Sequence, residues 1–418
     1  MYRSSSWLAI ACCTGLFGTA AAADPPASGA AAATPPPPAT LAQAIAAGKA
    51  KLSLRLRVES VDEDPFAKDA SAVTLRTRLA WQSADFRGFA LNLEADDIHA
   101  LDEDSYNSTA NGVTTRPVIG DPVGTEINVA ALTWKNKSLA VTAGRQRLVL
   151  DNQRFIGNVG WRQNEQTYDG VTLKFKPVAR LELTAGGLWN VNRVFGPRTG
   201  TQLADWHGNV KLLNAKIDAG KIGSLSLFGY AMDFDNAAAV SNATWGAALN
   251  GSPELSGGWK LTYALSFASQ SDAGDNPTDY TAGYRQLEVG LAKGPYALRI
   301  GQEVLEGDAT LANHRFQTPL ATLHAFQGWA DKFLTTPPQG VEDSYVAAAA
   351  TVRGTALKLE WHDFRAEAVS RSYGSEWNAS IGRTFAKRYE VLAKFADYQA
   401  DGFATDTTKW WLMFTAAF

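Results

Sequence analysis

Alternation of apolar and polar residues is the feature that most constrains how this chain can fold. Residues 51–59 place leucine or valine at every second position, with charged residues such as Arg55 and Arg57 between them. A period of two residues is that of a β-strand with one apolar face. The pattern returns at 73–82 and at 258–268, and no helical periodicity of comparable length is present. The sequence therefore predicts an all-β protein.

The connections between the predicted strands separate a barrel from a soluble sandwich, whose strands would alternate too. Some connections are short, such as 83–88 and 135–138, and others are long and polar, such as 97–125, 147–166 and 305–343. Short turns on one side and long loops on the other are typical of outer-membrane barrels. The count is 18 strands if 305–343 is entirely loop. The even strand number of single-chain bacterial barrels favours that assignment.

The end of the chain supports the same architecture. One face of the last predicted strand carries Trp410, Leu412, Phe414, Ala416 and Phe418. A final strand that ends in an aromatic residue resembles the signal read by the outer-membrane assembly machinery. Tryptophans at positions 81, 134, 189, 259, 361 and 410 fall near predicted strand ends, where aromatic girdles lie. We predict one transmembrane antiparallel β-barrel in the outer membrane of a Gram-negative bacterium, although core aromatics of a soluble β-protein would give a similar pattern.

The start of the chain predicts export. A basic start, an apolar stretch at 7–20 and a small-residue cleavage site predict a signal peptide over residues 1–23. Residues 24–40 are almost entirely alanine and proline and predict an extended periplasmic tether, so the barrel would occupy 41–418. Both cysteines lie within residues 1–23. The mature chain would then have neither disulfides nor thiolate metal sites.

Composition and motifs argue against two other classes of protein. A formal net charge of -3 lacks the basic surplus of a nucleic-acid binder. The five histidines are scattered without metal-ligand spacing, and no GxSxG motif or phosphate-binding loop is present. We therefore expect no enzyme activity, no cofactor and no metal. A barrel enzyme acting on lipid or polysaccharide is the alternative.

Three stretches of the sequence resemble the alginate-export family of outer-membrane porins. They are TLRTRLAW at 74–81, GRQRLVLDNQRFIGNVGWRQNEQTYDG at 144–170 and TPLATLHAFQGWADKFLTTPPQGVEDSY at 318–345. The similarity runs from residue 50 to Phe418. It implies an 18-stranded barrel that passes a polyanionic sugar polymer, alginate or a similar polyuronate, along an arginine-rich constriction, with long loops at both mouths. A general small-solute porin is the alternative within this class.

The partners expected for such a protein follow from this interpretation. They are an anionic polysaccharide, outer-membrane lipid, the barrel assembly machinery and periplasmic export components, and they do not include nucleic acid.

The charged strand faces would line the channel, because the non-lipid face of a wide barrel meets water. The strand candidates are Arg55, Arg57, Arg76, Arg78, Lys260, Arg299 and Lys358. Like charges on adjacent strands are unfavourable unless an anion or an acidic side chain compensates them. A basic lining would make the channel anion-selective. The same residues could instead form interior ion-pair ladders that only stabilise the wall.

Two loops supply the remaining candidates. Within 144–170 they are Arg145, Arg147, Asp151, Asn152, Arg154, Trp161 and Arg162. We expect this loop to fold into the lumen, with Asp151 fixing one arginine, whereas the alternative is an external loop with solvated arginines. The segment 318–345 would be a gate or plug, and its candidate residues are His324, Trp329, Asp331 and Lys332. The sequence does not indicate which mouth this segment closes.

Overall fold

The computed structural model describes residues 38–418, so the predicted signal peptide and most of the tether lie outside the described residues. The described chain begins with a short helix, α1 (Leu41–Ala46), which the sequence analysis did not predict. Thr40 caps this helix by accepting a hydrogen bond from the backbone N–H of Gln43 at 3.2 Å. None of the helices within residues 38–418 is long and apolar enough to cross a membrane.

All other regular structure within residues 38–418 is β-strand, apart from four short 3-10 turns. The strands are β1 (Lys49–Glu63), β2 (Ala70–Gln82), β3 (Phe89–Ala100), β4 (Gly124–Lys135), β5 (Leu139–Gln146), β6 (Thr167–Val178), β7 (Leu181–Asn192), β8 (Asp205–Asp218), β9 (Ser224–Phe234), β10 (Asn242–Gly251), β11 (Trp259–Asp272), β12 (Thr281–Lys293), β13 (Tyr296–Leu305), β14 (Val341–Val352), β15 (Thr355–Arg365), β16 (Ser372–Phe385), β17 (Tyr389–Ala400) and β18 (Thr407–Ala417). The 3-10 turns are η1 (Gly220–Ile222), η2 (Ala238–Val240), η3 (Ser256–Gly258) and η4 (Leu323–Ala325).

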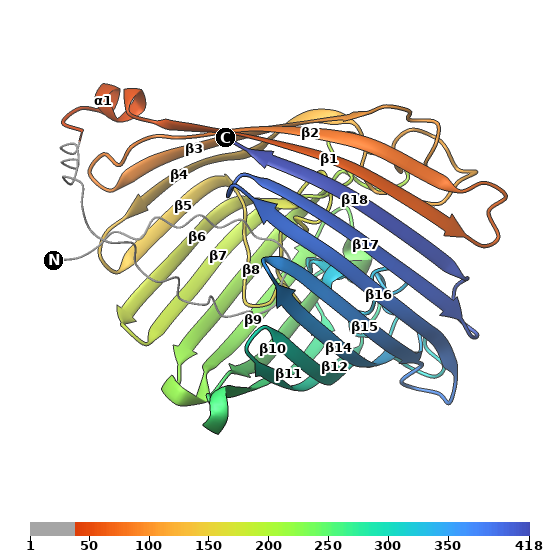
Figure 1. Ribbon diagram of the computed structural model, residues 1–418. Helices are drawn as coiled ribbons and strands as arrows, with labels where there is room; N and C mark the ends of the chain where they lie inside the picture. The colour runs from red at the N-terminus through yellow and green to blue at the C-terminus, as the bar shows by residue number, and fades with distance from the viewer. Residues whose placement is uncertain (1–37) are drawn as a thin grey trace.

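The strands form one closed antiparallel barrel, which confirms the predicted fold class and the count of 18 (Figure 1). Each strand pairs with its neighbours in the chain, and β1 closes the ring by pairing with β18. At the seam, Leu52 and Phe418 exchange two backbone hydrogen bonds of 3.1 and 2.9 Å. The last residue of the chain therefore takes part directly in closure.

The two ends of the barrel differ. Connections after even-numbered strands are short turns, and this end, called the turn end here, also holds α1 and the C-terminus (Figure 1). Connections after odd-numbered strands emerge at the opposite end, called the loop end. The longest of them are residues 101–123, 147–166 and 306–340. The segment 306–340 contains no strand, as the predicted count of 18 strands required.

The outer surface of the barrel is apolar. Leu56 and Leu79 are exposed, while Arg57 and Arg76 on the opposite faces of the same strands are buried inside. Exposed aromatic residues gather near both ends of the strands. They are Phe89, Trp259, Tyr296, Phe385 and Phe418 towards the turn end, and Trp189, Trp245, Phe267, Trp377 and Trp410 towards the loop end. An apolar belt between two aromatic girdles is the lipid-facing surface of an outer-membrane barrel, and the protein is located in that membrane.

The packed core lies inside the barrel. Phe155 and Ile156 of loop 147–166 and Leu320 and Phe333 of loop 306–340 join inward residues of the wall, such as Tyr284, in one buried cluster. Both loops therefore enter the lumen from the loop end, as we expected for the first loop. The space they occupy is where a candidate site would lie.

Candidate channel constriction

The two long loops bind each other across the lumen. The backbone N–H of Gly157 donates to the carbonyl of Leu320 at 2.9 Å, and that of Thr322 donates to the carbonyl of Gln153 at 3.0 Å. The Thr322 hydroxyl also donates to the Gln153 side-chain oxygen at 2.7 Å. Loops 147–166 and 306–340 thus form a single insert in the barrel.

Arginines from β1 and β2 hold this insert through its backbone. Arg57 donates to the carbonyl of Trp161 at 2.7 Å, and Arg55 donates to the carbonyl of Gly160 at 3.0 Å. Arg76 donates to the carbonyl of Gln163 at 3.4 Å. The like charges predicted to cluster on adjacent strands do so, and loop carbonyls are part of what compensates them.

Carboxylates compensate the rest of this positive charge. Arg57 lies 2.9 Å from Glu59, and neither side chain is exposed to solvent. Arg57 also lies 3.6 Å from Asp121, a residue of loop 101–123. Arg162 forms ion pairs with Glu59 at 3.0 Å and with Asp331 of the other loop at 3.3 Å. These arginines are enclosed in ion pairs and do not face open solvent.

A second cluster forms around Glu165. Its carboxylate pairs with Arg78 at 2.5 Å and with Arg147, and Arg147 also pairs with Glu94 at 2.7 Å. Arg78 additionally pairs with Asp96 on β3. Burial alone would raise the pKa of Glu165, but Arg78 and Arg147 hold that pKa well below its usual range. The carboxylate is therefore a fixed negative charge in the constriction.

The opposite wall anchors the insert through Arg154. Its Nε lies 2.7 Å from a carboxylate oxygen of Glu303 on β13, and its Nη1 donates to the hydroxyl of Thr318 at 3.0 Å. Tyr284 and Gln327 donate to the same carboxylate at 2.7 and 2.8 Å. Arg154 thereby ties both loops to a part of the wall that is not adjacent to β1 and β2.

The candidate gating residues of loop 306–340 lie in a buried aromatic pocket. His324 Nδ1 lies 2.8 Å from Asp331, and His324 Nε2 lies 2.7 Å from the ammonium group of Lys394 on β17. Lys394 sits over the rings of Trp161 and Trp329, 4.0 and 3.7 Å from their centroids. The predicted gate residues therefore pack against the wall and against the first loop.

Lys332, the fourth gate candidate, bonds to Glu63 at the loop end of β1 at 2.6 Å. This contact fixes the return of loop 306–340 towards the wall.

A smaller group of charged residues retains access to the lumen. Arg299 lies 3.2 Å from Glu288, and Lys358 lies 2.8 Å from Glu360. The side chains of Arg147, Arg299 and Lys358 are 31%, 24% and 33% exposed. These three cations are the positions of the site where a passing solute could meet a partly free positive charge.

Arg145 was predicted to line the channel, but it faces the outside of the barrel. Ala143 pairs with the exposed Leu132 on the outward face of β5, and Arg145 continues that face. Its guanidinium donates to the carboxylate of Asp169 at 2.8 and 2.9 Å. Arg147 reaches the lumen because β5 has already ended at residue 146.

Asp151 and Asn152 are further corrections. The Asp151 carboxylate accepts hydrogen bonds from Asn214 at 2.7 Å and Ser226 at 2.6 Å, so it fixes the loop to β8 and β9 and does not hold an arginine. Asn152 is exposed, and its side chain accepts from the backbone N–H of Arg154 at 3.2 Å.

Lys260 also lies away from the constriction. It is the second residue of β11, at the turn end, and its ammonium group pairs with Glu254 at 3.4 Å. Lys260 is also near the start of the predicted strand 258–268, so its place at one end of the barrel could have been predicted; only its face was considered.

Sequence reasoning missed several residues that organise the site. Gln163 is buried, accepts from Arg55 Nε at 2.8 Å and donates to the Thr74 hydroxyl at 2.8 Å. Glu165 lies in the 144–170 stretch with Gln163 and could have been noticed there. Asp121 gave no local signal, because its partners Arg57 and Arg162 are distant in sequence.

Comparisons with known proteins find similar solved structures but no similar sequence family. No family model and no curated protein matches this sequence. OccAB1 of Acinetobacter baumannii superimposes with a TM-score of 0.69 at 13% identity, over 90% of this chain and 97% of that chain. OpdO of Pseudomonas aeruginosa gives 0.69 at 12% identity, over 90% and 98%. OccK9 (OpdG) of Pseudomonas aeruginosa gives 0.70 at 14% identity, over 90% and 100%.

At these identities the comparisons establish the fold. It is the fold of outer-membrane porins of the Occ and Opd type. The comparisons do not single out the alginate-export family that the three sequence stretches resemble.

Proposed function

We propose that the protein is a porin, a passive outer-membrane channel for small water-soluble solutes. The observation that carries the proposal is the insert formed by loops 147–166 and 306–340. The two loops are hydrogen-bonded to each other, and they are held to β1 and β2 on one part of the wall and to β13 on another. A channel narrowed by a fixed insert is suited to solutes of limited size. A long sugar polymer would require that insert to move aside, against contacts such as Arg57 with Trp161 and Arg154 with Glu303.

The charges of the constriction support a preference among small solutes. Most arginines of the constriction are enclosed in ion pairs, and Arg147, Arg299 and Lys358 are partly exposed cations within it. Each lies beside a carboxylate, which lowers the net charge of the lining. We infer a moderate preference for small anions such as monocarboxylates, and anion selectivity weaker than a bare arginine ring would give.

Liposome swelling tests the proposal. Vesicles containing the purified protein would be exposed to a neutral hexose, to the uronate of the same size and to long uronate oligomers. We expect both monomers to enter, the uronate faster, and the oligomers to be excluded. Entry of the oligomers would instead support the polyuronate export that the sequence resemblance implies. No entry of any solute would contradict a channel and favour the alternative of a barrel enzyme with a closed lumen.

A further inference from the structure

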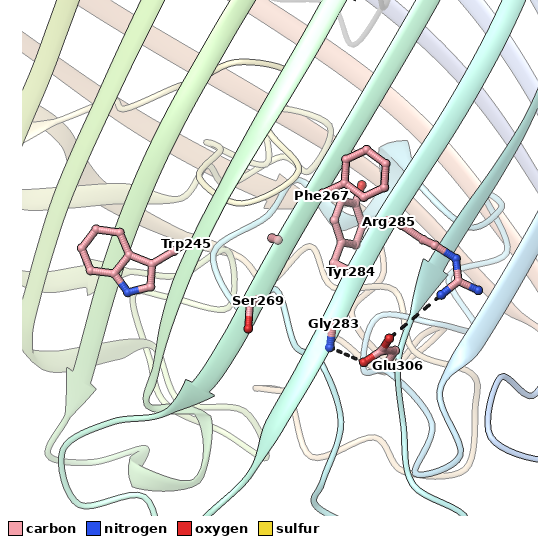
Figure 2. Close-up of a pocket in the computed structure, with 8 residues that line it drawn as sticks. Trp245, Phe267, Ser269, Gly283, Tyr284, Arg285 and Glu306 are labelled. Atoms are coloured by element: carbon pink, nitrogen blue, oxygen red, sulfur yellow. Dashed lines mark hydrogen bonds and ion pairs between the residues drawn. The ribbon is translucent and has the colours of Figure 1, made fainter.

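A groove of about 380 Å³ lies on the outer wall of the barrel, near the loop end. Register places Trp245 beside Ser269 and Ser269 beside Gly283 across β10, β11 and β12, and Phe267 beside Arg285. Figure 2 shows the ring of Phe267 and the guanidinium of Arg285 on neighbouring strands, while the indole of Trp245 points away from them, over Gly229 of β9. Trp245 and Phe267 are 63% and 54% exposed and belong to the girdle at the loop end.

Glu306 shapes the rim of the groove. The backbone N–H of Gly283 donates to its carboxylate at 2.6 Å. A Cβ atom at position 283 would lie 2.7 Å from that carboxyl group, so the side chain of Glu306 would have to shift to admit one. The floor made by Ser269 and Gly283 therefore carries little side-chain volume, and the groove stays open between the aromatic residues and Arg285.

Arg285 is weakly engaged by the protein itself. Its Nη1 lies 4.0 Å from Glu306, and the two side chains are 42% and 43% exposed. Arg145, the other outward arginine described above, forms a two-pronged pair with Asp169 at 2.8 and 2.9 Å. A positive charge on a lipid-facing wall is unfavourable unless it reaches the interface and finds an anionic partner there. Arg285 has the position and the free donors for such a partner.

The long loops of outer-membrane barrels lie on the extracellular side, so the loop end meets the outer leaflet. We propose that this groove binds a phosphate-bearing lipid of the outer leaflet, with the phosphate on Arg285 and the first acyl carbons against Phe267 and Trp245. Guanidinium is the side-chain group best matched to phosphate geometry. Exposed Trp and Phe at the girdle mark the level where apolar chains meet polar headgroups. Glu306 lies at the rim and opposes the phosphate charge, so it limits the affinity of the site.

Native mass spectrometry of the full chain in detergent tests this proposal. The probes are bis-phosphorylated lipid A and the same lipid with its phosphates removed, and the readout is the dissociation constant of the first bound lipid. We expect the phosphorylated lipid to bind about tenfold more tightly to the wild type, as one charge-assisted contact would give. Arg285→Gln should bring the two lipids within about twofold of each other.

Two further variants make the result specific. Arg383→Gln is the matched control, because Arg383 also faces outward but lies two residues from Phe385 at the turn end. Arg383→Gln should leave the preference for the phosphorylated lipid unchanged. Glu306→Gln keeps an oxygen for the Gly283 N–H and removes the opposing charge, so it should tighten binding of the phosphorylated lipid.

Some outcomes would overturn the proposal. Equal binding of both lipids by the wild type would do so, as would equal losses in Arg285→Gln and Arg383→Gln, or weaker binding in Glu306→Gln. Each variant would first be shown to migrate as a folded, heat-modifiable barrel, so that loss of folding is not mistaken for loss of a site.

Discussion

The ring of His324 stacks on the indole of Trp161, with centroids 4.5 Å apart and an interplanar angle of 4°. The two residues belong to different loops, so this contact joins the two halves of the insert. His324 Nε2 faces the Lys394 ammonium group at 2.7 Å, and Nδ1 faces Asp331 at 2.8 Å. An imidazole between a cationic donor and a carboxylate acceptor fits as the neutral tautomer with its proton on Nδ1. The docked insert therefore requires an uncharged His324.

This requirement makes the insert sensitive to acid. Burial is the largest cause that places the pKa of His324 well below its ordinary 6.5; Lys394 and Arg162 lower it further, and Asp331 opposes the shift. An undocked imidazole regains its ordinary pKa and takes up a proton below pH 6.5, which the docked one does not. Below pH 6.5 the free energy of docking of the insert should therefore become less favourable by up to about 1.4 kcal/mol per pH unit.

We therefore expect channel openings in planar bilayers to become more frequent as the pH falls from about 7.5 to about 5.5. His324→Gln cannot take up the proton and should flatten this dependence. If the variant kept the full pH response, another group would be responsible.

The pair of Arg154 and Glu303 should control how firmly the insert is docked. The two side chains are 1% and 3% exposed, so Arg154→Met would leave a buried carboxylate without its cation. Loss of one partner of such a pair costs about 3–5 kcal/mol. We expect faster proteolysis within loop 147–166, because cleavage follows the undocked population. Adding Glu303→Gln should restore much of the protection, and Arg116→Met in loop 101–123 should have no effect. Equal cleavage in the single and double variants would contradict this coupling.

Excision of loop 306–340 should widen the channel without opening the barrel. The backbone N–H of Asp308 donates to the carbonyl of Pro338 at 2.9 Å, so the neck of the loop is already closed. Replacing residues 309–337 by a short Gly/Ser linker keeps this neck. We expect a severalfold higher single-channel conductance and normal heat modifiability. Shortening the mainly exposed segment 112–115 is the control, and unchanged conductance after excision would show that the loop does not limit flow.

Ion selectivity should depend on the partly exposed cations. The double change Arg299→Gln and Lys358→Gln removes the cations that pair with the carboxylates of Glu288 and Glu360. The reversal potential under a KCl gradient should then move towards cation preference, and high salt should reduce the effect. Lys260→Gln removes the same kind of charge at the turn end and should change little. An equal shift in the control would mean that net charge, and not the constriction, sets selectivity.

The alternation of apolar and polar residues was sufficient to predict the barrel and part of the site. Alternation placed Arg57 and Arg76 on the inward face, and the absence of alternation delimited loop 147–166 at the residues where the structure has it. Arg145 could have been placed correctly from the same rule, because it continues the apolar face of residues 139–143. The prediction instead followed the family resemblance, which implied that Arg145 lies in the constriction.

The course of the insert could not be predicted in this way. Gln163 bonds to Thr74, 89 residues earlier, and its backbone N–H donates to Asp121, 42 residues earlier. Such partners are chosen by the closed three-dimensional arrangement of the wall, and no short-range period encodes them. The same applies to the ion pairs that neutralise the predicted arginine lining, since the compensating carboxylates come from other strands and loops.

Closure through Leu52 and Phe418 has a consequence for the order of folding. The seam joins the first strand to the last, so it is the pairing with the greatest sequence separation and the slowest to find by chain diffusion. Until β18 has been exported, β1 has no partner on that side and the nascent sheet has two unpaired edges. A chain that lacks β18 would therefore keep two unpaired strand edges, which favour aggregation, even if every residue of its lumen were intact.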